Sequence, residues 1–253
     1  MWDELACPED NGRFERSRGW LSCAQCGRGF PVIDAMPHVF PADELPCWRA
    51  AQQARLDELA IRAAEGGRDP QASRQMGRRI EEWLRPHVRI VSGTRLVELG
   101  SSGSARLEGF RCGLRYGVDP LAGALAAHGL LRAGPVRWVA GSPEYLPLAS
   151  GAFEVVLLCG ALEQAADPQR VLAETRRVLA PHGVVWLEVA LQDPQDGIGR
   201  RATRVPAVTG QLWAFTMAAV QQLIAESGLA AVQRMVTPLH QTAGLMETDG
   251  EAA

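Results

Sequence analysis

The chain has 253 residues and a formal net charge of −3, from 26 basic residues, all of them arginine, and 29 acidic ones. Apolar residues make up 47% of it and charged residues 22%, which supplies a sizeable core and excludes a wholly disordered chain. Neither half has a basic excess, which argues against nucleic acid as a partner. The sequence contains no run of eighteen apolar residues and no secretory leader, so we expect a cytoplasmic protein with no membrane contact.

Residues 1–41 predict a small module of short strands, because cysteine, proline and glycine alternate there with short apolar pieces. Cys23 and Cys26 have the C-x-x-C spacing that is typical of a zinc knuckle. A cytosolic setting makes disulfides an unlikely use of these thiols. The spacing therefore points to metal chemistry.

The partner knuckle begins at Cys7 and has Asp10 where a second cysteine would stand. A carboxylate also binds zinc, so Cys7 and Asp10 can complete a structural site with the intact knuckle. Cys47 and His38 are alternative ligands. The other interpretation is a ribbon without metal that packs on a small apolar core.

Residues 42–92 predict a helical linker or cap. Asp43 can cap a first helix that runs to Ile61. A second helix follows Pro70, and its apolar residues recur at helical spacing as far as Val88. We expect both helices to cover a core.

Residues 93–246 alternate between apolar strands and helices, which predicts an α/β fold with a Rossmann-like, doubly wound and mostly parallel sheet. The expected strands are 95–99, 115–119, 136–140, 153–158, 184–189 and 230–236, and the expected helices are 105–112, 120–131, 168–179 and 216–227. Residues 247–253 lack periodicity and predict a flexible tail.

The turn after the first strand is the candidate ligand site, since such sheets bind ligands beyond the carboxyl ends of their strands. Glu98 is followed by the small residues of 100–104, which permit a sharp turn and close ligand approach. Asp119 ends the next strand and can accept hydrogen bonds from both hydroxyls of a ribose. The dinucleotide pattern G-x-G-x-x-G fits poorly here, because Ser102 and Ala105 occupy its second and third positions.

The pattern E-x-G-x-G-x-G fits better, with Glu98, Gly100, Ser102 and Ser104 in register. Five further segments follow in order: YGVDP at 116–120, AGSPEYLPL at 140–148, GAFEVV at 151–156, LEQAADP at 162–168 and ETRRVLAPHG at 174–183. Together these motifs resemble class I S-adenosylmethionine-dependent methyltransferases over about residues 80–237.

This resemblance implies S-adenosylmethionine as cofactor and S-adenosylhomocysteine as product. The cofactor-binding residues that it implies are Glu98, Gly100, Ser101, Ser102, Gly103, Asp119, Pro120, Ser142, Pro143, Glu144, Cys159 and Gly160. The sequence departs from the family at Ser142, which replaces an adenine-binding Asp, and at Gln164, which replaces a His. The family's last strand has no clear counterpart, and residues 239–246 offer only a stub.

The run GRGFPVIDAMP at 27–37 resembles the zinc-ribbon activators of tRNA and protein methyltransferases, over about residues 5–40. Such domains occur fused to methyltransferases or as separate subunits that stabilise them. The resemblance implies a structural zinc ion and a protein partner or a homodimer.

Methyl transfer needs an in-line nucleophile and benefits from a base, for which Glu163, Tyr145 and His182 are candidates. Each has a simpler interpretation, as a helix cap, an adenine cover and a turn residue. The acidic balance and the helical cap favour a small-molecule acceptor. Two alternatives stay open: a scaffold or partner subunit with impaired catalysis, and an RNA or protein methyltransferase.

Overall fold

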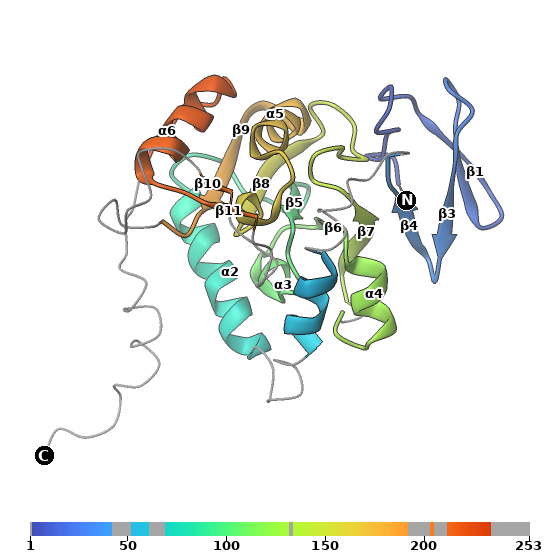
Figure 1. Cartoon of the computed structure of the whole chain (residues 1–253), viewed down its shortest axis with the longest axis horizontal. Coiled ribbons are helices and arrows are strands. Elements are labelled where there is room, and N and C mark those ends of the chain that lie inside the picture. The colour runs from blue at the N-terminus through green and yellow to red at the C-terminus, as the bar shows by residue number, and fades with distance from the viewer. Residues whose placement is uncertain are drawn as a thin grey trace, which may run out of the picture.

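The computed structural model describes residues 2–41, 52–60, 69–131, 134–191, 203–204 and 212–233. Within these residues the main sheet has nine strands in the order β1-β2-β3-β4-β7-β6-β5-β8-β9 (Figure 1). The strands are β1 (Phe14–Ser17), β2 (Trp20–Cys23), β3 (Gly29–Ile33), β4 (Met36–Val39), β5 (Arg95–Leu99), β6 (Leu114–Asp119), β7 (Val136–Gly141), β8 (Phe153–Cys159) and β9 (Leu179–Glu188).

Strands β5 to β9 are mutually parallel, and β5 and β8 lie side by side at the centre of that part. Most residues of β5 and β8 are apolar and buried, as expected for strands covered on both faces. The chain crosses from β5 to β6 and β7 on one side and then to β8 and β9 on the other. This order creates a switch point between β5 and β8, where such folds bind ligands. The Rossmann-like prediction is confirmed.

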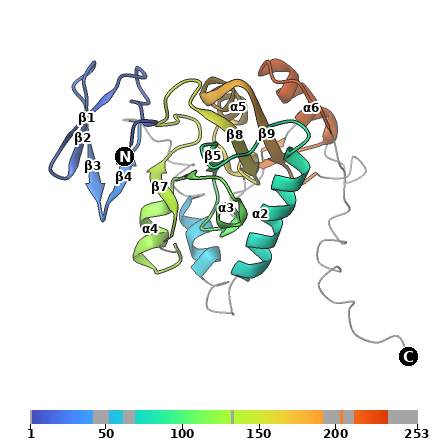
Figure 2. The ribbon, with the colours of Figure 1, turned by 180° about the vertical axis from the view of Figure 1, so that it is seen from behind.

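Helices cover both faces of the parallel strands (Figures 1 and 2). On one face, α2 (Pro70–Leu84) and α3 (Arg106–Gly109) pack on β5 and β8 through Ile80 and Leu107. On the other face, α5 (Pro168–Val178) and α6 (Met217–Glu226) pack through Val171 and Val220. α4 (Ala122–Ala127) follows β6, and the helical residues 52–60 pack on it through Leu59.

The helix predicted after Pro70 begins there because Asp69 caps it, accepting hydrogen bonds from two backbone amides. It ends at Leu84, two residues before Pro86, so Val88 lies beyond it. The first predicted helix is seen at residues 52–60, and its start at Asp43 lies outside the described residues.

The first four strands form an antiparallel meander that joins the main sheet edge to edge. β4 pairs in parallel with β7, through His38 opposite Ala140 and Val39 opposite Gly141. The meander therefore continues the sheet of the larger domain, and Figures 1 and 2 place it at the end opposite α6.

A buried polar contact reinforces this junction. The hydroxyl of Tyr116, on β6, donates to the Glu4 carboxylate and accepts from Arg137 Nη1 at 2.6 Å. Arg137 also lies 3.9 Å from Glu4, and Trp2 packs edge-on against the Tyr116 ring. Burial raises the pKa of Tyr116, and its bond to Glu4 acts in the same direction, so the phenol stays protonated.

The structure corrects two predicted elements. β9 begins at Leu179, not at Val184, because residues 180–183 bulge out of a strand that continues on both sides. The strand expected over 230–236 is wrong for residues 230–233, which are exposed and pair with no described strand. Residues 234–236, and the stub at 239–246, lie outside the described residues.

A short pair, β10 (Thr203–Arg204) with β11 (Trp213–Ala214), was not predicted. The helices that the structure describes include none that is long and apolar enough to span a membrane.

Candidate functional site

The loop after β5 has the conformation of a ligand-binding turn. Gly100, Ser102 and Gly103 have φ values of 66°, 51° and 73°, in the region that side chains disfavour. Ser102 adopts this conformation although it stands where the pattern E-x-G-x-G-x-G has glycine. The serine therefore leaves the shape of the turn unchanged. The loop is tied to β6, since the Gly100 amide donates to Val118 at 2.9 Å. Ser101 Oγ is buried without a hydrogen-bond partner among the described residues.

Asp119 ends β6 beside this loop, with only 2% of its surface exposed. One carboxylate oxygen accepts the Ser102 amide at 2.7 Å and the other accepts the Leu121 amide at 2.8 Å. Burial raises the pKa of Asp119, and these two hydrogen bonds oppose the shift. Each oxygen keeps a further lone pair, so the carboxylate can still accept hydrogen bonds from a ligand.

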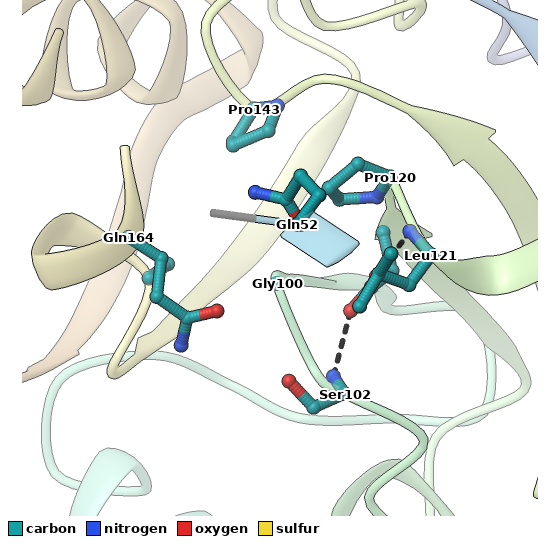
Figure 3. A pocket seen from close by; sticks show the side chains of 9 residues that line it. Gln52, Gly100, Ser102, Pro120, Leu121, Pro143 and Gln164 are labelled. Carbon is teal, nitrogen blue, oxygen red and sulfur yellow. Dashed lines mark hydrogen bonds between the residues drawn. The ribbon is translucent and has the colours of Figure 1, made fainter. Parts of the chain in front are cut away.

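A small pocket lies beside these groups (Figure 3). Its floor comes from the β5 loop and the end of β6, and its walls come from the segments after β7 and β8. Gln52, from the helical residues 52–60, also lines it. The lining residues are Gln52, Gly100, Ser102, Asp119, Pro120, Leu121, Pro143, Ala161 and Gln164.

Five of the twelve predicted cofactor residues thus line the pocket: Gly100, Ser102, Asp119, Pro120 and Pro143. Leu121 and Ala161 follow predicted residues directly in the sequence. Gln52 was missed, because nothing in a helical pattern shows which strand end the helix will cover. The other seven, Glu98, Ser101, Gly103, Ser142, Glu144, Cys159 and Gly160, are not among its lining residues.

Glu98 is fully buried on the face that α2 and α3 cover. Its carboxylate lies 3.3 Å from Arg106 Nη1, and Glu188 lies 3.8 Å from the same nitrogen. Burial alone would lower the pKa of Arg106, but the two carboxylates outweigh it and the net shift is upward. Glu98 therefore holds α3 to the strand ends through an ion pair.

The predicted adenine-side residues bond to one another. Ser142 Oγ donates to Glu144 Oε2 at 2.5 Å and accepts from the Glu144 amide at 3.2 Å. The other Glu144 oxygen accepts the Ala166 amide at 2.7 Å. Tyr145 is covered by the guanidinium of Arg170, 3.9 Å from the ring centroid. This network fixes the loop after β7.

Of the proposed bases, Glu163 is buried in η1 (Leu162–Gln164), just before the pocket residue Gln164. Its Oε1 accepts the Ala190 amide at 2.7 Å, and Oε2 has no hydrogen-bond partner among the described residues. Burial raises the pKa of Glu163. His182 is exposed in the bulge at the start of β9, at the opposite end from the pocket, because β9 and β8 run in parallel.

Cys159 lies at the end of β8. Burial raises its pKa well above the usual value, despite the nearby Arg106. A thiol in this state stays protonated, so it is a poor nucleophile.

The second candidate site is a cluster in the meander. One ligand atom from each of Cys7, Asp10, Cys23 and Cys26 lies within 4.8 Å of all the others. The structure thus brings together the four residues that the sequence suggested. Of the alternatives, His38 lies on β4 against Gly123, and Cys47 lies outside the described residues.

The two turns that hold the cluster have the same hydrogen bonds. The carbonyl of Cys7 accepts from Asn11 at 2.8 Å, and that of Cys23 accepts from Gly27 at 2.9 Å. Asn11 and Gly27 both have positive φ, 59° and 73°. The Cys7 and Cys23 amides each donate to the carbonyl five residues ahead. Asp10 therefore stands at the position that Cys26 holds in the other turn.

The α/β region, residues 93–246, contains a match to a known protein family. Residues 97–187 match the family model described as "Methyltransferase domain". Uncharacterized proteins of Mycobacterium tuberculosis and Mycobacterium bovis are 33% identical over 185 residues, which cover 67% of this chain. The chain spans 58% of the length of these curated relatives.

Two solved structures are similar at lower identity. A Burkholderia thailandensis 1,6-didemethyltoxoflavin-N1-methyltransferase, with its substrate and S-adenosylhomocysteine, gives a TM-score of 0.49 at 17% identity, covering 81% of this chain and 85% of that one. A complex that contains the Haloferax volcanii Trm112 methyltransferase activator gives a TM-score of 0.47 at 16% identity. The match covers 82% of this chain and 88% of the chain in that structure.

Proposed function

From the premise that residues 97–187 are a methyltransferase domain, we propose that the chain transfers a methyl group from S-adenosylmethionine to a small-molecule acceptor. The observation that carries this proposal is Asp119. It is a buried carboxylate at a strand end, lines the pocket and has lone pairs left for two ribose hydroxyls. The cofactor would supply an activated methyl group on a sulfonium.

The rest of the pocket fits a nucleoside of this kind. The loop at 100–103 consists of small residues, three of them with positive φ, which permits close approach of the methionine portion. Ser101 Oγ is a buried hydroxyl that still needs a partner. The pocket is lined by apolar atoms from Pro120, Leu121 and Pro143, which suit a base.

Calorimetric titration with S-adenosylhomocysteine tests cofactor binding. We expect a dissociation constant in the micromolar range, about −8 kcal/mol. An absence of binding at millimolar ligand overturns the proposal and favours the second candidate, a scaffold that has lost its cofactor. The bond from Ser142 to Glu144 is the observation that favours the scaffold, because it withdraws a predicted adenine contact.

We propose Glu163 as the base when the acceptor carries a proton. Its buried carboxyl has a raised pKa, which brings its proton affinity nearer to that needed at neutral pH. Glu163→Gln keeps an oxygen for the Ala190 amide, so the fold should survive. The expected result is a turnover about 100-fold lower with unchanged cofactor affinity. Unchanged turnover removes this assignment.

The acceptor class can be tested by incubating the protein with radiolabelled cofactor and with extracts separated by size. We expect label in the small-molecule fraction, because the chain has a net charge of −3 and no basic excess for RNA, and Gln52 of the helical residues 52–60 narrows the pocket. Label in RNA or protein would favour the alternative class of acceptor.

We also propose that the cluster in the meander holds a structural zinc ion through three thiolates and the Asp10 carboxylate. Burial raises the pKa of Cys7 to about 12, so a cation is needed to keep that group as a thiolate. All four tetrahedral positions are filled by the protein, which suits structural rather than catalytic zinc. The β4–β7 pairing then supports a role for the meander as a stabilising module within the same chain.

A further inference from the structure

Gln52 enters the pocket from an element outside the methyltransferase domain. It belongs to the helical residues 52–60, which are held in place where Leu59 packs with Leu121 and Leu125. Only 9% of Gln52 is exposed, and Figure 3 shows its side chain between Pro143 and Pro120, above Gly100. Its amide makes no hydrogen bond to another described residue. The residue is therefore largely buried while its amide stays available to a ligand in the pocket.

The polar side chains of Ser142 and Gln164, which are near Gln52, already make hydrogen bonds within the protein. The Ser142 hydroxyl is committed to Glu144, as donor and as acceptor. Gln164, on the opposite wall, donates its amide nitrogen to the Gly160 carbonyl at 3.0 Å. Of the side chains that line this part of the pocket, the amide of Gln52 keeps both its donor and its acceptor for a ligand.

The position of Gln52 matches one part of the cofactor. A ribose held by Asp119 directs its base toward Pro120, Leu121 and Pro143, which follow the ends of β6 and β7. A glutamine amide pairs with the edge of adenine, accepting from the 6-amino group and donating to an adjacent ring nitrogen. Gln52 lies between the two prolines, where that edge would arrive.

We propose that Gln52 reads the adenine edge of S-adenosylmethionine, in place of the strand-end residue Ser142. The inference rests on the proposed function and adds a specificity residue to it. It also gives the helical residues 52–60 a role: they bring the base-reading group to a pocket whose strand ends lack one.

The experiment compares two ligands on each protein: S-adenosylhomocysteine and its analogue with purine in place of adenine, which lacks the 6-amino group. Wild type should bind the adenine ligand about five-fold more tightly than the purine ligand. In Gln52→Ala and in Gln52→Leu, the second of which fills the same space, this ratio should fall to about one. Because both ligands bind the same protein, a general loss of stability does not alter the ratio.

Gln53→Ala is the matched control. Gln53 is the next residue of the same helix, is exposed, and donates to Asp57 at 2.8 Å on the surface. Its loss should leave the five-fold ratio intact. If wild type shows the ratio and the Gln52 variants keep it, the assignment of Gln52 is overturned while the cofactor site stands. If wild type binds neither ligand, the proposed function is overturned and this inference with it.

Discussion

The two candidate sites are assembled over very different lengths of chain. The metal cluster uses residues 7–26, and two tight turns with matching hydrogen bonds place its ligand atoms. The pocket uses residues 52–164, drawn from a helix and from the segments after four different strands. The cluster is therefore set by local backbone geometry, whereas the pocket exists only once the parallel sheet has formed.

This difference has an energetic consequence. A small meander has little core of its own, so a metal ion would contribute directly to its folding. The pocket residues sit on a framework that apolar strands already stabilise, so their loss should weaken ligand binding more than folding. The following experiments separate these two kinds of effect.

Removal of the metal should have the largest effect. Binding of structural zinc contributes on the order of 10 kcal/mol in small modules, so Cys23→Ser should lose the ion and unfold the meander. Metal content by mass spectrometry and thermal unfolding measure this. Cys112→Ala, at a buried cysteine far from the cluster in sequence, should keep the metal. Full stability in a protein free of zinc would show that the module folds without it.

Asp119→Ala should act on the pocket and on the loop that its carboxylate holds through the Ser102 and Leu121 amides, and not on the metal cluster. The two hydrogen bonds expected from the ribose hydroxyls of the cofactor to this carboxylate are lost. Their loss predicts a cofactor affinity lower by at least about 100-fold. Zinc content should not change. Asp57→Ala, at an exposed carboxylate on the helix above the pocket, is the control and should bind normally. Equal cofactor affinities of the two variants would show that Asp119 does not contribute to cofactor binding.

Tyr116→Phe tests how firmly the two regions are joined. It removes one buried hydroxyl between Glu4 and Arg137, which should lower the free energy of unfolding by about 1–3 kcal/mol. Denaturant titration measures the change. Neither zinc content nor cofactor affinity should move, since neither site contains this group. A neutral result would mean that the β4–β7 pairing carries the junction by itself.

Asp10→Cys should have the smallest effect. The two turns have the same geometry, so a thiolate fits at this position without rearrangement. We expect tighter zinc binding in a chelator competition, by about ten-fold or less, with cofactor affinity unchanged. Weaker binding would argue that the carboxylate is adapted to this turn.

The sequence predicts best what depends on neighbouring residues. The C-x-x-C spacing and its copy at Cys7 and Asp10 identify the four clustered groups, because a turn fixes their separation. The strand β5 was predicted at its observed bounds, because Leu96, Val97 and Leu99 are aliphatic and the small residues of a turn follow them directly. Asp119 was found because its place at a strand end follows from the alternation of strands and helices.

Contacts between distant segments could not be predicted in the same way. Gln52 faces the pocket because its helix packs on α4, and nothing in its own segment indicates that. Tyr116 and Glu4 are 112 positions apart and meet only through the order of the strands. The bulge before Val184 contains Pro181 and Gly183, which signal a turn, yet the strand resumes because β8 offers partners on both sides.

The central claim is that the pocket between β5, β6 and the helical residues 52–60 holds the cofactor. The most direct measurement is a crystal structure of the full chain with S-adenosylhomocysteine. We expect the ribose hydroxyls within hydrogen-bond distance of Asp119 and the adenine between Pro120 and Pro143, with its edge toward Gln52. A pocket that stays empty at saturating ligand, or ligand bound at another place, would contradict the account.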